Sequence, residues 1–199
     1  MADHPPLLIL ASTSRYRREL LERLRLPFIV EAPQVDESAR AGESPRELAL
    51  RLAKAKAKAV AEHHPGAWVI GSDQVAELAG EAIGKPGQHE AAVAQLRRMS
   101  GRSVRFHTGL ALVAPGFEAL RCVDVNVRFR TLDGAEIERY LRLEQPYDCA
   151  GSAKSEGLGI ALLDAIESDD PTALIGLPLI ALCGLLRASG YAVLDEAGR

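Results

Sequence analysis

Residues 7–24 read LLILASTSRYRRELLERL and contain three consecutive patterns. The apolar run from Leu7 to Ala11 is typical of a short buried strand, and the small polar residues Ser12, Thr13 and Ser14 are typical of a turn. Beyond the turn, the leucines at positions 20, 21 and 24 recur on one face at helical spacing. This stretch therefore predicts a strand, a tight turn and a helix, in the order found in α/β proteins.

The rest of the chain continues this alternation and adds a hairpin. Ser44 and Glu47 form a capping-box pattern that opens a helix to about Ala61, and Pro115 and Gly116 separate two long β-like segments, which predicts an antiparallel pair. Further strands are predicted at 28–32, 67–73, 103–114, 118–130 and 191–194, and further helices at 91–99, 135–143 and within the apolar run 173–186. We expect one α/β domain over residues 1–199, with a mixed sheet.

Composition restricts the function classes. The 199 residues are 47% hydrophobic and 26% charged, with a formal net charge of −3, which does not favour a nucleic-acid polymer as partner. The N-terminal residues MADHPP lack the pattern of a signal peptide, and the apolar run 173–186 is too short to span a bilayer. Three cysteines at 122, 149 and 183 show no zinc or disulfide spacing. A reduced cytoplasmic location without membrane contact is predicted.

The hydroxyl-rich turn is the first candidate site. A turn between a strand and a helix offers free backbone N–H groups and the positive end of the helix dipole, so it is suited to an anion such as phosphate. Arg15, Arg17 and Arg18 add charge, and a guanidinium can bind phosphate oxygens bidentately. The alternative is a solvated basic face with Ser14 as a simple helix cap. The P-loop pattern, with its glycines and lysine, is absent from this stretch.

Carboxylates and lysines elsewhere provide further candidates. Asp73 is expected at the end of the strand 67–73, where ligand crevices open in α/β sheets and a carboxylate can hold a divalent ion or orient a water. Asp36 and Glu37 supply two more carboxylates in a loop. The alternative is that Asp73 caps a loop and that Asp36 and Glu37 form a solvated acidic pair. Lysines 56, 85 and 154 are candidate phosphate contacts. The histidines have no ligand-spaced partners in the sequence, and a GxSxG elbow is absent.

Seven ordered segments together carry a resemblance that none carries alone. They are LASTSRYRRELL, VDES, SPRELALRLAKAKA, VIGSDQ, GKP, SGRSVRFHTGL and CAGSAKSEGLGI followed by GLPL. In this order, over nearly the whole chain, they resemble the Maf family of nucleoside triphosphate pyrophosphatases. The resemblance implies an elongated α/β fold with a mixed sheet and two lobes around a deep cleft, similar to inosine triphosphatases. It also implies release of pyrophosphate from a nucleoside triphosphate with a divalent metal, Mg²⁺ or Mn²⁺.

The resemblance assigns roles position by position. Asp73 becomes the general base and a metal neighbour, and Glu37 becomes an acidic residue near the metal. Positions used around the triphosphate fall on Ser12, Arg17, Lys56 and Lys85. A metal and cations would neutralise charge on the bridging and leaving oxygens, while a carboxylate prepares the attacking water. A homodimer is also consistent with the resemblance.

Three positions distinguish subtypes within the family: Tyr16, Gln74 and Glu156. Their contexts, RYRR, SDQ and KSEG, resemble the subtype that hydrolyses 7-methyl-GTP. The chemistry agrees, because 7-methylguanine is cationic and an aromatic face such as Tyr16 attracts a cation. The carboxylate of Glu156 is suited to accept both donors of the guanine edge, whereas glutamine suits a uracil edge. The alternatives are a packing role for Tyr16 and a solvated charge for Glu156.

Two other functions remain open at this point. One is a dTTP/UTP pyrophosphatase of the same family, against which the pattern at positions 16, 74 and 156 argues. The other is a nucleotide-binding regulator of cell division without catalysis, against which the complete set of Asp73, Lys56, Lys85 and Arg17 argues.

Overall fold

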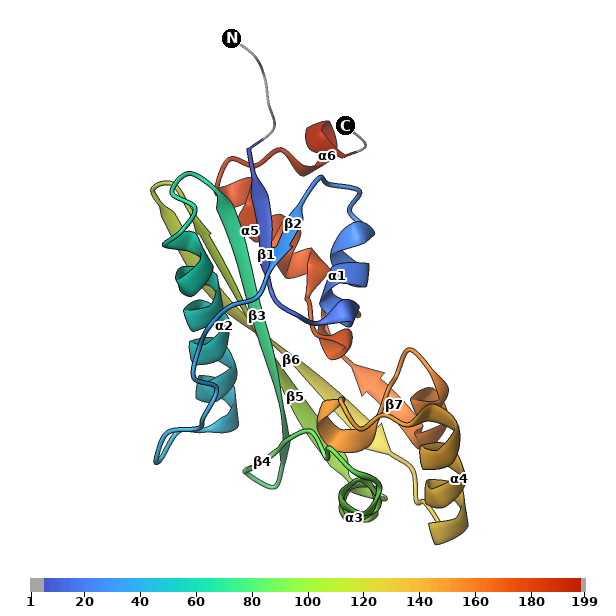
Figure 1. The fold of residues 1–199 in the computed structure, drawn as a ribbon. Helices are drawn as coiled ribbons and strands as arrows, with labels where there is room; N and C mark the ends of the chain where they lie inside the picture. The colour runs from blue at the N-terminus through green and yellow to red at the C-terminus, as the bar shows by residue number, and fades with distance from the viewer. Residues whose placement is uncertain (1–5, 198–199) are drawn as a thin grey trace.

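The computed structural model describes residues 6–197 and shows one mixed sheet with helices packed around it (Figure 1). The described part leaves out residues 1–5 and 198–199. The expected lack of a signal peptide rests partly on residues 1–5 and so lies outside it. The strands are β1 (Leu8–Ala11), β2 (Ile29–Glu31), β3 (Trp68–Leu78), β4 (Glu81–Ile83), β5 (Ser103–Ala114), β6 (Phe117–Phe129) and β7 (Leu163–Glu167). The α-helices are α1 (Arg15–Glu22), α2 (Pro45–Ala61), α3 (His89–Met99), α4 (Gly134–Glu144), α5 (Leu179–Ala188) and α6 (Val193–Glu196).

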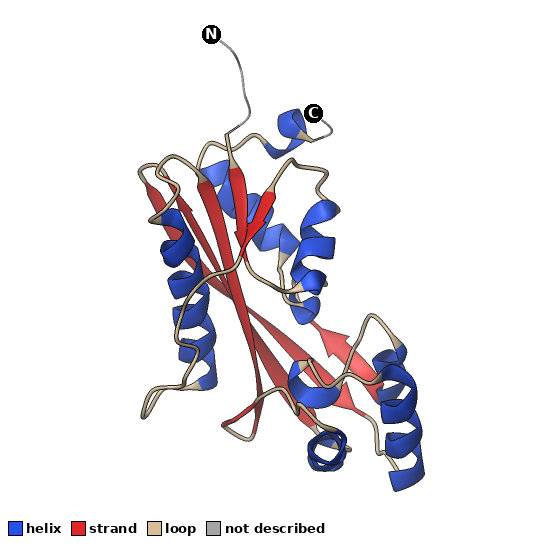
Figure 2. Ribbon diagram, in the orientation of Figure 1, coloured by secondary structure: helices blue, strands red, loops and turns tan. Residues whose placement is uncertain are grey.

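The sheet is mixed because its two halves are built differently. Its order is β2-β1-β3-β5-β6-β7, with β1 parallel to β2 and β3, and with every pairing from β3 to β7 antiparallel (Figure 2). The short strand β4 folds back on the end of β3. The α/β mixed sheet predicted from the sequence is confirmed.

Two apolar clusters divide the molecule into two lobes that share the long strands β3, β5 and β6 (Figure 1). One cluster gathers leucines of β1, α1 and α5 against Ile70, Leu110 and Leu112. The other gathers side chains of α3 and α4 against the far halves of the same strands, including Phe106 and Val125. Continuous strands through both lobes fix the lobes relative to each other.

Helix α2 lies unusually close to the sheet because glycines face it. A Cβ on Gly71 would stand 2.2 Å from the carbonyl oxygen of Ala53, and one on Gly109 would stand 2.3 Å from that of Ala49. These distances are far below van der Waals contact, so only glycine fits at either position. Alanines at 49, 53 and 57, all fully buried, complete the close approach from the helix side.

Most predicted elements are present, with two corrections. Strand β3 does not end at Asp73 but continues to Leu78, because the reversal occurs at Ala79 and Gly80, which both have positive φ. Residues 191–194 form no strand; Tyr191 is buried against α5 and Trp68, and a short helix begins at Val193. Strands β4 and β7 have no counterpart among the predicted elements.

Within the described residues, every helix is too short or too polar to cross a membrane. The capping box of Ser44 and Glu47 is confirmed at the start of α2, and Pro178 precedes α5 as expected.

Candidate active site

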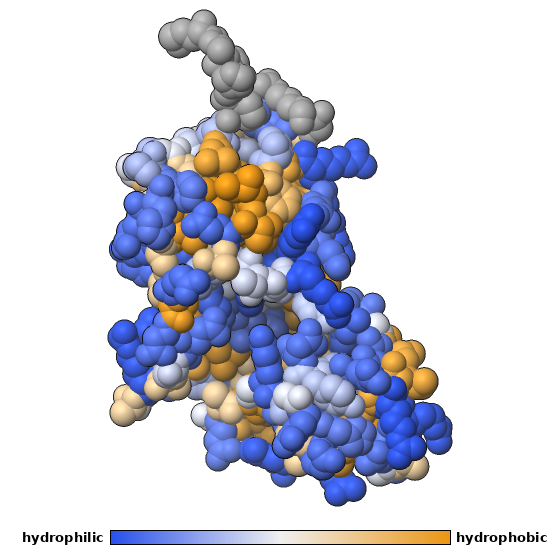
Figure 3. All heavy atoms as spheres, viewed as in Figure 1, coloured by the Kyte–Doolittle hydropathy of each residue, from blue (hydrophilic) through white to orange (hydrophobic). Residues whose placement is uncertain are grey.

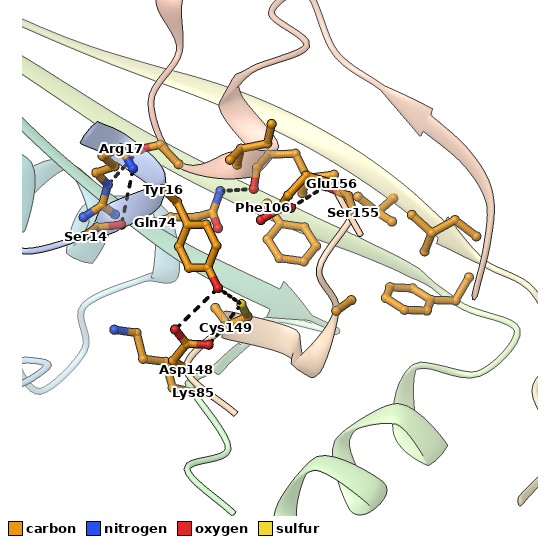
Figure 4. A pocket seen from close by; sticks show the side chains of 18 residues that line it. Ser14, Tyr16, Arg17, Gln74, Lys85, Phe106, Asp148, Cys149, Ser155 and Glu156 are labelled. Atoms are coloured by element: carbon orange, nitrogen blue, oxygen red, sulfur yellow. Dashed lines mark hydrogen bonds between the residues drawn. The ribbon is translucent and has the colours of Figure 1, made fainter. Parts of the chain in front are cut away.

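A cleft between the lobes collects most of the residues singled out in the sequence. Its charged part is lined by the β1–α1 turn, the loop before α2, α2 itself, β3 and the segment after β4. An adjoining, more apolar part is lined by β3, β5, β6 and the loop 148–156 (Figure 4). Both parts share Ser14, Tyr16, Arg17, Gln74, Lys85, Asp148 and Ala150, so they form one continuous site.

The hydroxyl turn is organised by its own side chains. Ser12 Oγ accepts from the backbone N–H of Ser14 at 3.1 Å, and Ser14 caps α1 by accepting from the N–H of Arg17. Ser12 is buried at 2% exposure. The start of α1 and its dipole therefore face the cleft, as the anion-site interpretation requires.

Of the three arginines, Arg15 and Arg17 line the charged part of the cleft, and Arg17 is anchored there by the backbone. Its Nε donates to the carbonyl oxygen of Gly176 at 2.9 Å, and its Nη1 lies 3.5 Å from Ser12 Oγ. Burial lowers the pKa of the Arg17 guanidinium, while the nearby charges of Asp73 and Glu37 oppose that shift. Arg18 instead forms an exposed pair with Glu22. Arg18 therefore belongs to a solvated basic face, whereas Arg17 does not.

Lys56 joins the two candidate carboxylates. Its Nζ lies 2.6 Å from Asp73 Oδ1 and 2.7 Å from Glu37 Oε1, and its side chain is only 7% exposed. Asp73 lies in the middle of β3 opposite Gly109, on the sheet face that α2 covers. The neighbouring lysines Lys54 and Lys58 point away and pair with Glu118 on β6. The alternating lysines of α2 therefore have separate roles.

Glu37 is electrostatically tuned by its neighbours. Its partial burial opposes ionisation, but the hydrogen bond and charge of Lys56, helped by Lys85 and Arg17, outweigh this and leave the pKa of Glu37 below its ordinary value. At neutral pH the cleft therefore presents a carboxylate with one free oxygen here. Together with Asp73 it offers the oxygen donors that Mg²⁺ or Mn²⁺ prefers.

The loop that carries Glu37 is fastened to α2 by Arg51. This guanidinium donates to both carboxylate oxygens of Glu43 and, at 2.8 Å, to the carbonyl of Ser38. The pairing lowers the pKa of Glu43 to about 2. Residue types and spacing alone do not reveal this bidentate anchor, which holds Glu37 within reach of Lys56.

Gln74 points to the opposite face of β3 from Asp73. Its Nε2 donates to the carbonyls of Ala173 and Leu174, each at 2.9 Å, and to Thr108 Oγ1 at 3.1 Å. These acceptors fix the amide nitrogen toward the 173–176 turn. Gln74 also lines the site, so the amide oxygen is its remaining group for a ligand.

The apolar part of the site has a mixed lining. Phe106, Val127, Phe129 and Leu163 supply its floor, and loop residues Asp148, Cys149, Ser155 and Glu156 supply its rim. Of the two carboxylates, Glu156 lines the apolar part alone, whereas Asp148, like Arg17 and Lys85, lines both parts. The far end of the apolar part therefore offers a carboxylate away from the cations of the charged part. Of the residues in this apolar part, the sequence identifies Glu156 but neither Asp148 nor the aromatic side chains Phe106 and Phe129.

Tyr16 stands where the two parts meet (Figure 4). Its hydroxyl accepts from Arg15 at 2.7 Å and lies 3.5 Å from Asp148 Oδ2. The Arg15 guanidinium is 4.7 Å from the ring centroid, and the Lys154 ammonium is 5.8 Å from it. The ring is thus already an attractive position for cations. Lys154 itself pairs with Glu144 at 2.9 Å and is not among the residues that line either part of the cleft, so its predicted phosphate contact is not supported.

Close relatives of the chain share almost its full length. A protein of Albidiferax ferrireducens is 64% identical over 189 residues, covering 94% of this chain and 95% of that protein. A Burkholderia thailandensis protein is 63% identical over 199 residues, covering 98% and 93%, and a Bordetella pertussis protein is 61% identical over 186 residues, covering 94% of each. All three are named 7-methyl-GTP pyrophosphatase.

A solved structure of the Staphylococcus aureus Ham1 protein is similar to the chain with a TM-score of 0.45 and 18% identity, over 62% of this chain and 71% of that one. The family described as Maf-like protein matches residues 7–189, which include both parts of the cleft. By this match, and by relatives above 60% identity, the chain belongs to the Maf family.

Proposed function

We propose that the chain is a nucleoside triphosphate pyrophosphatase that converts 7-methyl-GTP to 7-methyl-GMP and diphosphate. The observation that carries the proposal is one continuous site with several cations in its charged part and a carboxylate at the far end of its apolar part. Arg17, Lys56 and Lys85 line the charged part and are available to a triphosphate. Glu156 lines the apolar part alone and is available to a cationic base, and Asp148 lines both parts. The names of the close relatives support the same substrate.

Asp73 is the proposed general base. It lies on a rigid central strand with its Oδ1 paired to Lys56, so its second oxygen is the one directed to a water. When a triphosphate enters, the Lys56 ammonium has a third anionic partner, which places the phosphate chain beside Asp73. Arg17, whose Nε is fixed by the carbonyl of Gly176, holds the phosphate oxygens through its remaining guanidinium N–H groups.

A divalent cation, Mg²⁺ or Mn²⁺, is part of the proposal, and the donor set fits it. Glu37 and Asp73 would hold it, because both are carboxylates at the charged part of the cleft. When bound, the ion supplies charge neutralisation on the phosphate oxygens. Removal of metal with EDTA is expected to abolish turnover, and added Mg²⁺ or Mn²⁺ is expected to restore it.

The base is proposed to lie between Tyr16 and the carboxylate rim. The Tyr16 ring attracts the positive charge of 7-methylguanine, and Glu156 accepts from its edge donors. Gln74 contributes an acceptor oxygen from the side of β3. Because Glu144 neutralises Lys154, that lysine opposes the cationic base only weakly.

The test of the catalytic role compares Asp73→Asn with wild type in a pyrophosphate-release assay with magnesium. We expect loss of nearly all activity while the unfolding transition remains cooperative. The matched control is Asp164→Asn, an exposed carboxylate on β7, which should retain full activity. Full activity of Asp73→Asn would reject Asp73 as the base.

The substrate test measures kcat/KM for 7-methyl-GTP, GTP, dTTP and UTP. Loss of a cation–π contact worth about 0.5–2 kcal/mol predicts that Tyr16→Ala reduces kcat/KM for 7-methyl-GTP about 2- to 30-fold more than for GTP. Glu156→Gln should act in the same direction. A preference for dTTP and UTP would favour the other enzymatic subtype, and tight binding without turnover would favour a non-catalytic regulator.

The proposal further places residues 1–199 in one functional unit, in the cytoplasm and as a homodimer. The apolar side chains of Ile29 and Val30 on the edge strand β2 are 45% and 43% exposed, and Figure 3 shows apolar atoms gathered over this part of the molecule. An exposed apolar sheet edge favours pairing with a second chain. Light scattering of the purified protein tests the oligomeric state.

A further inference from the structure

His107, Cys122 and Asp124 form a cluster on the β5–β6 hairpin. His107 is 3% exposed, and its Nδ1 lies 2.8 Å from Asp124 Oδ1; the thiol of Cys122 donates to the same oxygen at 3.4 Å. One ligand atom from each of the three residues lies within 4.8 Å of the others. Imidazole nitrogen, thiolate sulfur and carboxylate oxygen are the donors that bind Zn²⁺ in proteins.

The hairpin register creates the cluster and makes it rigid. Ala114 pairs with Phe117 across the turn, and the same register places His107 opposite Asp124 and Gly109 opposite Cys122. Residues 122 and 124 lie on one face of β6 because side chains alternate along a strand. Ligands held on adjacent strands need little reordering to meet one ion.

A fourth residue orients the imidazole. Glu77 on β3 lies 2.7 Å from His107 Nε2 and Asp124 lies 2.8 Å from Nδ1. A metal ion bound at Nδ1 would take the place of a proton there, and Nε2–H would continue to donate to Glu77. A carboxylate on the far nitrogen is the usual outer partner of a metal-binding histidine. Arg46 lies 3.9 Å from Asp124 Oδ2, the oxygen that faces away from the histidine and the thiol.

We propose that His107 Nδ1, Cys122 Sγ and Asp124 Oδ1 form a binding site for Zn²⁺ or a similar transition-metal ion. Tetrahedral zinc would separate its nitrogen and oxygen ligands by about 3.4 Å, and its sulfur and oxygen ligands by about 3.6 Å. The S–O separation already matches, and the N–O separation must open by about 0.6 Å. Partial exposure of Cys122 and Asp124 leaves a path for the ion and a fourth position for water.

The ligand set makes the site specific for a thiophilic cation. A thiolate is a soft ligand that binds best to a cation with high affinity for sulfur, and binding releases the thiol proton to solvent. Mg²⁺ prefers oxygen ligands and is not expected to bind here.

The cluster is separate from the cleft. The described residues that line either part of the cleft do not include His107, Cys122 or Asp124. This zinc site therefore stands independently of the proposed pyrophosphatase activity.

Cobalt provides the test, because Co²⁺ replaces Zn²⁺ and reports its ligands optically. The full-length protein is stripped with a chelator and titrated with Co²⁺ under reducing conditions. We expect one equivalent to produce the near-ultraviolet thiolate-to-cobalt band together with visible bands of a tetrahedral ion, and Zn²⁺ to abolish both. The cation at Glu37 and Asp73 has only oxygen ligands from those residues and gives no thiolate band.

Matched variants decide the assignment. Cys122→Ser should remove the thiolate band, whereas Cys183→Ser, which changes another half-buried free cysteine, should retain it. Glu77→Gln should weaken affinity about 10- to 100-fold, because the histidine loses its anionic outer partner. Asp73→Asn should leave the band unchanged, even if activity is lost. Absence of a thiolate band in the wild type, or its persistence in Cys122→Ser, would overturn the proposal.

Discussion

Substitution of Gly71 by alanine tests whether the approach of α2 to the sheet sets the geometry of the active site. A Cβ at this position would stand 2.2 Å from Ala53 O, 2.7 Å from Ala57 N and 2.9 Å from Ala57 Cβ. All three are on the backbone or first carbon of α2, so no flexible side chain can move aside. Relief to ordinary contact at about 3.4 Å requires the helix to shift by roughly 1 Å.

The shift has a cost in stability and a cost in activity. Overpacking of this kind destabilises by about 1–3 kcal/mol, and the upper end is expected because two successive turns of the helix are affected. Lys56 lies beside Ala57, so the shift also disturbs its 2.6 Å contact with Asp73. A displacement of about 1 Å at a catalytic centre can reduce turnover about 100-fold.

Urea unfolding followed by circular dichroism and a steady-state pyrophosphate assay measure the two effects. Gly184→Ala is the matched control, because Gly184 lies within α5 and an added Cβ meets nothing within 4 Å. Alanine there should stabilise by about 0.5–1 kcal/mol and leave activity unchanged. If Gly71→Ala matched the wild type in both stability and activity, the close approach of α2 would not be what positions Lys56.

Three further substitutions probe individual contacts. Arg17→Lys removes the planar fork that reaches Gly176, and we expect KM for the triphosphate to rise about tenfold or more while the fold is retained, as measured by kinetics and thermal unfolding. Glu43→Gln tests how the free energy of unfolding declines in acid. The pKa of Glu43 is about 2 beside Arg51, below its ordinary value. The stabilisation that the ionised Glu43 contributes is therefore present above about pH 4.5 and is lost as pH falls toward 2. The variant should show a flatter decline of unfolding free energy over this window, and an unchanged slope would contradict the assignment. Asp170 is 2% exposed, and its carboxylate accepts four hydrogen bonds at the start of α5 and in the preceding turn. Asp170→Asn should therefore destabilise the protein by about 1–3 kcal/mol. A urea midpoint equal to that of the wild type would exclude a stabilising role for these hydrogen bonds.

Local patterns predicted much of the fold because they depend on neighbours in the sequence. The capping box of Ser44, the strand and turn before α1 and the hairpin at Pro115–Gly116 all formed as expected. Strand ends were predicted less well. The run 67–73 is predicted to end at Asp73, since it closes on small and acidic residues, yet the other half of β3 is held by pairing with β4 and β5. The pairing with β5 joins residues about 30 positions apart, such as Gln74 and Thr108.

The candidate site shows the same division. The sequence identified Asp73, Lys56, Glu37 and Arg17 by residue type and by resemblance. Only the structure shows that Lys56 bridges the two carboxylates and that Arg17 is fixed by a backbone carbonyl. A carbonyl such as that of Gly176 leaves no trace in residue type, and so could not be anticipated.

By itself, the sequence determined most of the strands and helices in their order, apart from β4, β7 and the C-terminal segment, and the family to which the chain belongs. The tertiary structure decided which charges meet. Lys56 reaches Asp73 because helix and strand pack face to face, and His107 meets Cys122 and Asp124 because the hairpin register places them on one face. Spacing along the chain cannot reveal such groups, since their distances are set by packing and strand register.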